Sequence, residues 1–149
     1  MKKHGVKVLA ILIILVVWAW IAGCATMSDV ARAKEEGKGT TQVYPVNTDQ
    51  AWEIAMIVFR WEGADAIEEH RSQGYMLTSS GMNLVTAGTV MGAWIEPVDQ
   101  TSSKVTVVTK RRISTNLATT LTEATFHKRF AQAVEIVKKG DRLPLKPPE

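Results

Sequence analysis

An uninterrupted apolar segment near the N-terminus constrains this chain more than any other feature. Residues 8–22 carry no charged side chain, and Lys2, Lys3 and Lys7 precede them. A helix of these 15 residues is roughly 22 Å long, whereas the hydrocarbon core of a bilayer is about 30 Å thick. A basic start, a short apolar run and then small residues make the pattern of a secretory signal peptide. The lysines favour a cytoplasmic N-terminus and export of the following chain.

The apolar segment closes on Ile21-Ala22-Gly23-Cys24. This tetrapeptide resembles the lipobox of bacterial lipoproteins, although Ile21 stands where that family more often has Leu. The resemblance implies that the Cys24 thiol receives diacylglycerol and that a peptidase cleaves between Gly23 and Cys24. It also implies acylation of the new amine, with palmitate as the expected chain. Two or three acyl chains would hold the protein stably at a membrane, since each buried CH₂ contributes about 0.8 kcal/mol.

Two other interpretations of this segment stay open. One is an uncleaved single-pass anchor in which Trp18 and Trp20 lie at the membrane interface. The other is ordinary signal cleavage after Ala25. In enteric bacteria, Asp directly after the acylated cysteine favours retention in the inner membrane. Because Ala25 holds that position, the resemblance implies an outer-membrane anchor facing the periplasm in a cell that has two membranes.

Composition sets limits on the mature chain. Of 18 Lys and Arg residues, three lie in residues 1–23, which leaves 15 against 15 Asp and Glu. Nucleic-acid binding, which needs a basic surplus on the domain, is therefore not expected. Cys24 is the only cysteine, so we expect no disulfide.

The remaining charges are unevenly placed, with acidic residues gathered in 62–69 and basic residues in 104–142. We expect acidic and basic strands to pair across a sheet. The alternative is a basic face turned toward anionic lipid head groups or lipopolysaccharide.

We expect four segments: a signal peptide at 1–23, a flexible tether at 24–42, one α+β domain at 43–140 and a proline-rich tail at 141–149. The tether includes a short helix at 29–36 without an apolar stripe, so it should be mobile. The elements expected in the domain are a strand at 43–46, a helix from Asn47 or Thr48 to Glu62, strands at 64–70, 74–80, 84–97 and 104–112, and a helix from Thr120 to about Lys139.

Two periodic patterns support the helices. Trp52, Ala55, Met56 and Phe59 fall at i, i+3, i+4 and i+7 and predict a buried face. A second stripe on the same helix, formed by Ile54, Val58 and Trp61, is either covered or shows a partner surface. Thr120 and Glu123 predict a capping box at the start of the last helix.

The order β-α-β-β-β-β-α predicts an α+β fold, an antiparallel sheet of four to five strands with two helices on one face. This order resembles the helix-grip domains of small periplasmic lipoproteins, including the C-terminal modules of the BamC-like component of the outer-membrane protein assembly machine. The resemblance rests on element order alone and assigns no functional residue.

Glu123 and His127 lie four residues apart and share one helical face. With Arg111 and Arg112 on the neighbouring strand, they could form the acid/base site of an envelope hydrolase or transferase. The alternative is a structural histidine, hydrogen-bonded beside a capping glutamate, which we favour. No metal or cofactor is expected, because the histidines lack the spacing of a metal site.

Gly88 and Gly92 share one face of a predicted strand. We expect the close approach of a helix or a bend in the sheet there. The functional alternative is a shallow groove beside Trp94 that could hold a peptide or an acyl chain. Together these features predict a lipid-anchored periplasmic protein without catalysis, which holds a partner protein, an envelope polymer or lipid near the membrane.

Overall fold

The structure is a computed structural model that describes residues 26–80, 88–111 and 122–148. Predictions that concern other residues lie outside the described part of the chain. They include the signal peptide, the cleavage site after Gly23 and the acylation site Cys24.

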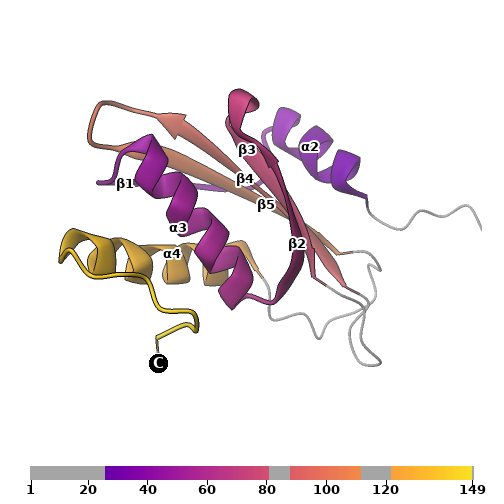
Figure 1. The fold of residues 1–149 in the computed structure, drawn as a ribbon. Coiled ribbons are helices and arrows are strands. Elements are labelled where there is room, and N and C mark those ends of the chain that lie inside the picture. Colours follow the sequence, from indigo (N-terminus) through magenta and orange to yellow (C-terminus); the bar gives the residue numbers. More distant parts are fainter. Residues whose placement is uncertain (1–25, 81–87, 112–121, 149) are drawn as a thin grey trace, which may run out of the picture.

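Five strands form one antiparallel sheet, as predicted (Figure 1). Its order is β1-β5-β4-β3-β2, so β1 and β2 are the two edges and β4 lies in the middle. The hairpins β2–β3 and β4–β5 follow the chain, and β1 pairs with the last strand. The strands are β1 (Thr40–Tyr44), β2 (Ala64–His70), β3 (Tyr75–Ser80), β4 (Thr89–Pro97) and β5 (Ser103–Arg111).

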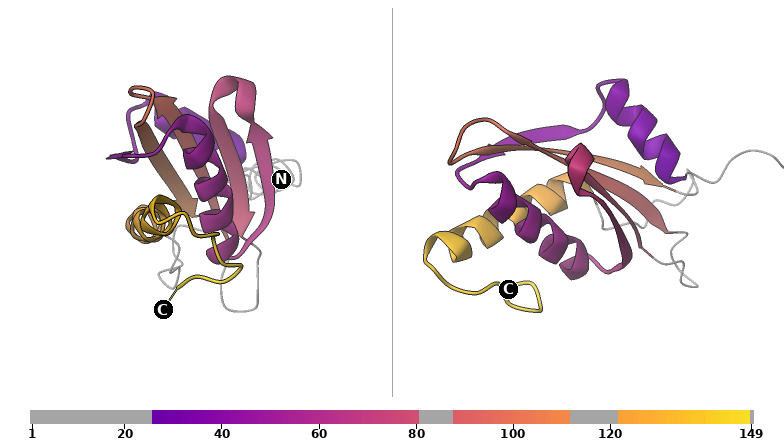
Figure 2. Two further views of the ribbon diagram at one scale, coloured as in Figure 1. Left: turned by 60° about the vertical axis from the view of Figure 1, so that its left-hand side comes forward. Right: turned by 45° about the horizontal axis from the view of Figure 1, so that its top comes forward.

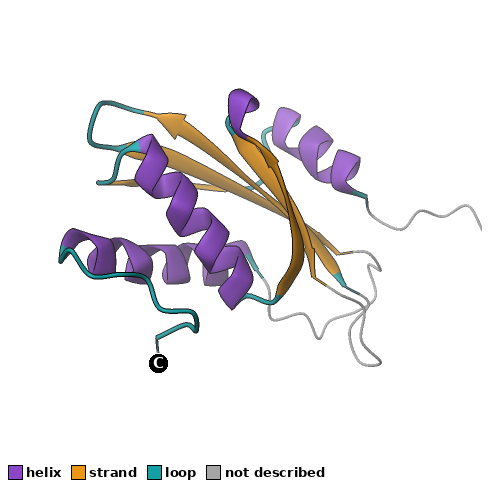
Figure 3. Cartoon of the chain, in the orientation of Figure 1, coloured by secondary structure: helices purple, strands orange, loops and turns teal. Residues whose placement is uncertain are grey.

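Two helices, α3 (Thr48–Trp61) and α4 (Glu123–Lys138), cover one face of the sheet, which we call the inner face (Figures 1 and 3). Asn47 caps α3 by accepting a hydrogen bond from the Gln50 amide, and Gly63 follows the last turn with φ of 82°. The α+β class and the placement of these two helices on one face are confirmed.

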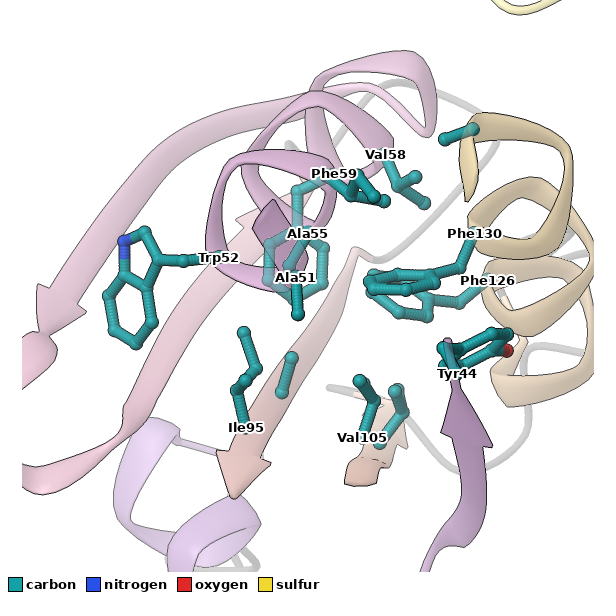
Figure 4. Packing of buried hydrophobic residues seen from close by; sticks show 14 of the residues in the cluster. Tyr44, Ala51, Trp52, Ala55, Val58, Phe59, Ile95, Val105, Phe126 and Phe130 are labelled. Carbon is teal, nitrogen blue, oxygen red and sulfur yellow. The ribbon is translucent and has the colours of Figure 1, made fainter. Parts of the chain in front are cut away.

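The inner face holds the main core (Figure 4). Aromatic rings meet between the helices and the sheet, with centroids 4.4 Å apart for Tyr44 and Phe130 and 5.0 Å apart for Phe59 and Phe126. The predicted face of α3 is buried at Trp52, Ala55 and Phe59. β4 contributes alternate residues to the same cluster, Met91, Ala93 and Ile95, as expected for a strand whose side chains alternate between faces.

A third helix, α2 (Met27–Glu35), packs on the opposite, outer face of the sheet (Figure 2). Val30 is 0% exposed and Ala33 is 2% exposed. The expectation of a mobile helix without an apolar stripe is therefore wrong. Met27, Val30 and Ala33 recur every three residues and give α2 a narrow apolar edge, which is enough because the sheet supplies the partner surface: Leu77, Val90 and Val108.

The presence of α2 also changes the burial of β5. Val105, Thr106, Val107 and Val108 are all buried, so this stretch of β5 is covered on both of its faces. Thr106 is only 6% exposed and Val108 is 1% exposed, because both lie on the face that α2 covers or borders. The middle of the sheet is thus enclosed from both sides.

Three further expectations need correction. β1 ends at Tyr44 rather than spanning 43–46, because the Val46 amide donates to the Tyr44 carbonyl in a turn (2.9 Å). α4 begins at Glu123, and its cap is Thr122, whose hydroxyl accepts from the Thr125 amide. The acidic strand β2 does not pair with the more basic β5, because β3 and β4 separate them.

The C-terminal residues 141–148 fold back across α3 and α4 (Figure 1). The Trp61 indole N–H donates to the Pro144 carbonyl (2.9 Å), and Leu143 packs against the core. Nη1 of Arg129 donates a hydrogen bond to the Pro148 carbonyl oxygen (2.6 Å). The second stripe of α3 is therefore covered within the chain, since Ile54 and Val58 are buried and the tail meets Trp61.

Candidate functional site

The predicted pair Glu123 and His127 lies at the start of α4, facing the edge strand β1. His127 is 2% exposed. Its Nδ1 lies 2.8 Å from the Tyr44 hydroxyl, and its Nε2 lies 2.9 Å from the Thr40 carbonyl oxygen. The imidazole therefore bridges two positions of β1, four residues apart.

The hydrogen bonds determine the tautomer of His127. A carbonyl oxygen only accepts, so Nε2 carries the proton that it donates to Thr40. Nδ1 then has a free lone pair and accepts from the Tyr44 hydroxyl. The Gln42 side chain lies 2.9 Å from the same hydroxyl oxygen. The Gln42 atom in this contact is Oε1, an acceptor, and the His127 carbonyl oxygen lies 3.2 Å from the same hydroxyl, so Nδ1 and these two oxygens compete for its one proton.

Burial keeps this network neutral. Burial lowers the pKa of His127, and the hydrogen bond to Thr40 and the negative charge of Glu123 oppose that shift. Burial also raises the pKa of the Tyr44 phenol. A neutral imidazole with one donor and one acceptor nitrogen matches the two partners it has, so both nitrogens are satisfied.

Glu123 binds β1 and β5 rather than His127. Its Oε2 accepts from the Thr40 hydroxyl (2.6 Å) and its Oε1 accepts from the Thr109 amide (3.0 Å). Of the two arginines expected nearby, Arg111 ends β5 with a side chain outside the described set, and Arg112 is not among the described residues. The Glu123 carboxylate thus binds the first turn of α4 to β1 and β5 through hydrogen bonds, and His127 binds the second turn to β1.

This arrangement favours a structural role for the pair. General acid/base catalysis needs a nitrogen or oxygen that reaches a substrate. Both nitrogens of His127 are occupied and its ring is enclosed. The one sequence signal for this role is Tyr44 in the first strand, but 83 residues separate it from His127, so spacing along the chain does not connect the two.

The second predicted site, around Trp94, lies on the outer face. A Cβ on Gly92 would lie 2.6 Å and 2.7 Å from two ring atoms of Trp94 and 2.9 Å from a methyl of Leu77. The indole of Trp94 therefore lies over Gly92 and fills the space that a side chain would need. The closest approach to Gly92 comes from a side chain two residues along the same strand, on the face of the sheet that α2 covers. Gly88 precedes β4 with φ of 77°, in the left-handed region.

Sequence reasoning missed a row of residues that crosses the whole outer face. His70 stacks on Tyr75 with centroids 4.5 Å apart, and Tyr75 stacks on Trp94 at 5.7 Å. The row continues with Thr106 on β5 and Thr41 on β1. The hydroxyl oxygens of these two threonines lie 2.9 Å apart. Each strand contributes one residue. The two stacked pairs join β2 to β3 and β3 to β4 across this face.

The remaining site types can be assessed within residues 26–80, 88–111 and 122–148. No group of three or more His, Cys, Asp or Glu side chains gathers there in a way that could hold a metal ion. No helix in those ranges has the length and apolar character needed to cross a bilayer.

Comparisons with known proteins add little. No family model matches the chain, and neither does any curated protein. Among solved structures, the chain is similar to the crystal structure of the ZhuI aromatase/cyclase from Streptomyces sp. R1128, with 12% identity and a TM-score of 0.29. That similarity covers 69% of this chain and 85% of the other.

Proposed function

We propose that this protein is a lipid-anchored periplasmic protein that binds or helps assemble another envelope component, without catalysis. In this proposal diacylglycerol and acyl groups on Cys24 tie the mature chain to the outer membrane. The observation that carries it is the tetrapeptide Ile21-Ala22-Gly23-Cys24 at the end of a short apolar run that follows three lysines.

Two features of the folded domain support a binding role. Its predicted acid/base pair is engaged in hydrogen bonds that fasten α4 to β1 and β5. The mature chain carries equal numbers of acidic and basic side chains, which suits recognition of a specific neighbour better than attraction to a strongly charged polymer.

Intact mass of the protein purified from membranes tests the anchor. The expected mass is that of residues 24–149 plus diacylglycerol and one further acyl chain. A Cys24→Ser variant should keep residues 1–23 and lack both additions, since the peptidase of this pathway acts on the modified cysteine. A wild-type mass of the full 149 residues without lipid would establish the single-pass alternative and overturn the proposal.

Crosslinking in intact cells tests the binding role. Photo-crosslinking residues placed at exposed positions at opposite ends of the domain, such as Ser28 and Gln100, should yield a discrete crosslinked species from at least one end. The Cys24→Ser variant is the control, because it should lose crosslinks that need the outer membrane. If every position gave only uncrosslinked monomer, the binding role would be refuted while the anchor stood.

A further inference from the structure

We infer that the protein meets the lipid surface with one defined end of its sheet, the end at which β3 and β5 finish and β4 begins. We call this the proximal end, and the end with the β4–β5 turn at 98–102 the distal end. This inference rests on the proposed acylation of Cys24, and it adds an orientation that the anchor alone does not supply.

The direction of α2 along the sheet carries the inference. The proximal end is defined by the row in which Ser80 and Arg111 both pair with Thr89. Lys34, near the end of α2, lies 3.9 Å from Glu96, which is one residue from the distal end of β4. The start of α2 therefore lies toward the proximal end, and Figure 2 shows the helix running in that sense.

The helix is held in this position by its own packing. Val30 and Ala33 are buried against β3, β4 and β5. Thr26 is tied to the first turn of the helix, because its amide (2.7 Å) and its hydroxyl (2.8 Å) both donate to the same oxygen of the Asp29 carboxylate. The folded body thus continues to within two residues of Cys24 in the sequence.

So short a connection leaves little freedom. Cys24 and Met27 are three residues apart, and three fully extended residues span at most about 10 Å. A flexible tether over residues 24–42 would instead have reached roughly 23 Å and let the domain turn freely. With acyl chains in the bilayer, the proximal end must stay next to the head groups.

The orientation assigns a role to the other end. Three segments lie at the distal end. Ser103 pairs with both Pro97 and Tyr44, which places turn 98–102 and the start of α3 at Thr48 there. Tyr75 pairs with Trp94, which places turn 71–74 near the same end. They are held about 30 Å from the bilayer, the length of nine strand residues. The distal end is therefore where a periplasmic partner has access.

Fluorophores at the two ends of the acylated protein test the orientation. Ser28→Cys marks the start of α2 and Gln100→Cys marks the distal turn, and both positions are exposed. Because Cys24 carries lipid, each introduced thiol is the only reactive one. The labelled proteins are reconstituted in vesicles of phosphatidylethanolamine and phosphatidylglycerol that contain a head-group nitroxide quencher.

We expect the label at position 28 to be quenched about threefold more than the label at position 100, because about 30 Å separates the two ends of the sheet. Inserting a Gly-Ser segment of about 12 residues between Ala25 and Thr26 should remove the difference, since a flexible coil of that length spans roughly 20 Å. Equal quenching without the insertion would overturn the orientation.

Mass spectrometry of each sample separates this result from failure of the anchor. An acylated protein with equal quenching at both labels refutes the orientation alone. A protein without acyl groups that stays in solution, with neither label quenched, refutes the anchor and the orientation together.

Discussion

The Tyr44 hydroxyl lies 2.8 Å from Nδ1 of His127 and joins the first strand of the domain to its last helix. The same imidazole reaches the Thr40 carbonyl through Nε2. An edge strand of five residues has only one neighbouring strand, so this contact with α4 supplies a second attachment. We therefore expect the network to contribute measurably to stability.

Tyr44→Phe tests that contribution. The variant keeps the ring but leaves Nδ1 of His127 buried without a donor, which should lower the free energy of unfolding by about 1–3 kcal/mol. Urea unfolding of the purified protein measures the change. Tyr75→Phe is the matched control, because Tyr75 is only partly buried, and removal of its hydroxyl should change the free energy by less than about 0.5 kcal/mol.

The burial of His127 predicts a loss of stability in acid. Its folded-state pKa lies below the ordinary value of 6.5, so between those two values the unfolded chain binds more protons than the folded one. The free energy of unfolding should therefore fall as the pH drops from neutral through 6.5, and the fall should level off below the folded-state pKa. His127→Gln should give a flatter profile over this window.

Glu62 acts with the opposite sign and must be allowed for. Burial raises the pKa of its carboxyl above 4.5, an effect that Arg129 partly offsets. The folded state then takes up a proton before the unfolded state does, which favours folding as the pH falls toward 4.5. Comparing wild type with His127→Gln at each pH cancels this contribution. If both profiles had the same slope above pH 6, the histidine would not be the titrating group.

Gly92→Ala should destabilise the sheet through the outer face. The new Cβ would lie 2.6 Å from the Trp94 ring, and overpacking of this kind costs about 1–3 kcal/mol. Thermal unfolding and near-ultraviolet circular dichroism of the indole measure the effect. In a Trp94→Leu background, Gly92→Ala should cost less stability than it does in the wild type. The shorter side chain at position 94 leaves room for the new methyl group.

Removing the tail should expose one face of α3. Deleting residues 142–149 takes away the acceptor of the Trp61 indole and the apolar side chain of Leu143. The tryptophan emission should shift to longer wavelength as Trp61 gains water contact. The matched control is the same deletion in a Trp61→Phe background, where the shift should be absent. A shift that persisted there would come from another tryptophan.

Much of the fold could be predicted because its signals are local. The helix α3 has a clear cap at Asn47, an apolar face with helical spacing, and a glycine after its last turn, so its bounds were predicted to within one residue. The hairpin β2–β3 was predicted with similar accuracy, because Gly74, with φ of 74°, supplies a left-handed turn residue that the sequence makes visible.

The rest depends on contacts between distant segments. The helix α2 is mostly polar, and only the outer face of the sheet gives Val30 and Ala33 something to pack against. The supposed pairing of acidic and basic strands failed because strand order is set by chain connections and core packing, which outweigh weak charge pairs at a surface. For the candidate site, the helical spacing of Glu123 and His127 was visible, but their partners on β1 were not.

One consequence follows from the enclosure of β4 between two layers of helices. Its amide protons are shielded by neighbouring strands at both sides, and its side chains are shielded above and below. Amide hydrogen exchange should therefore be graded across the sheet, slowest in the centre and fastest in β1 and β2. A sheet whose edge strands unfold locally while its central strand stays folded can rearrange an edge without losing its overall architecture.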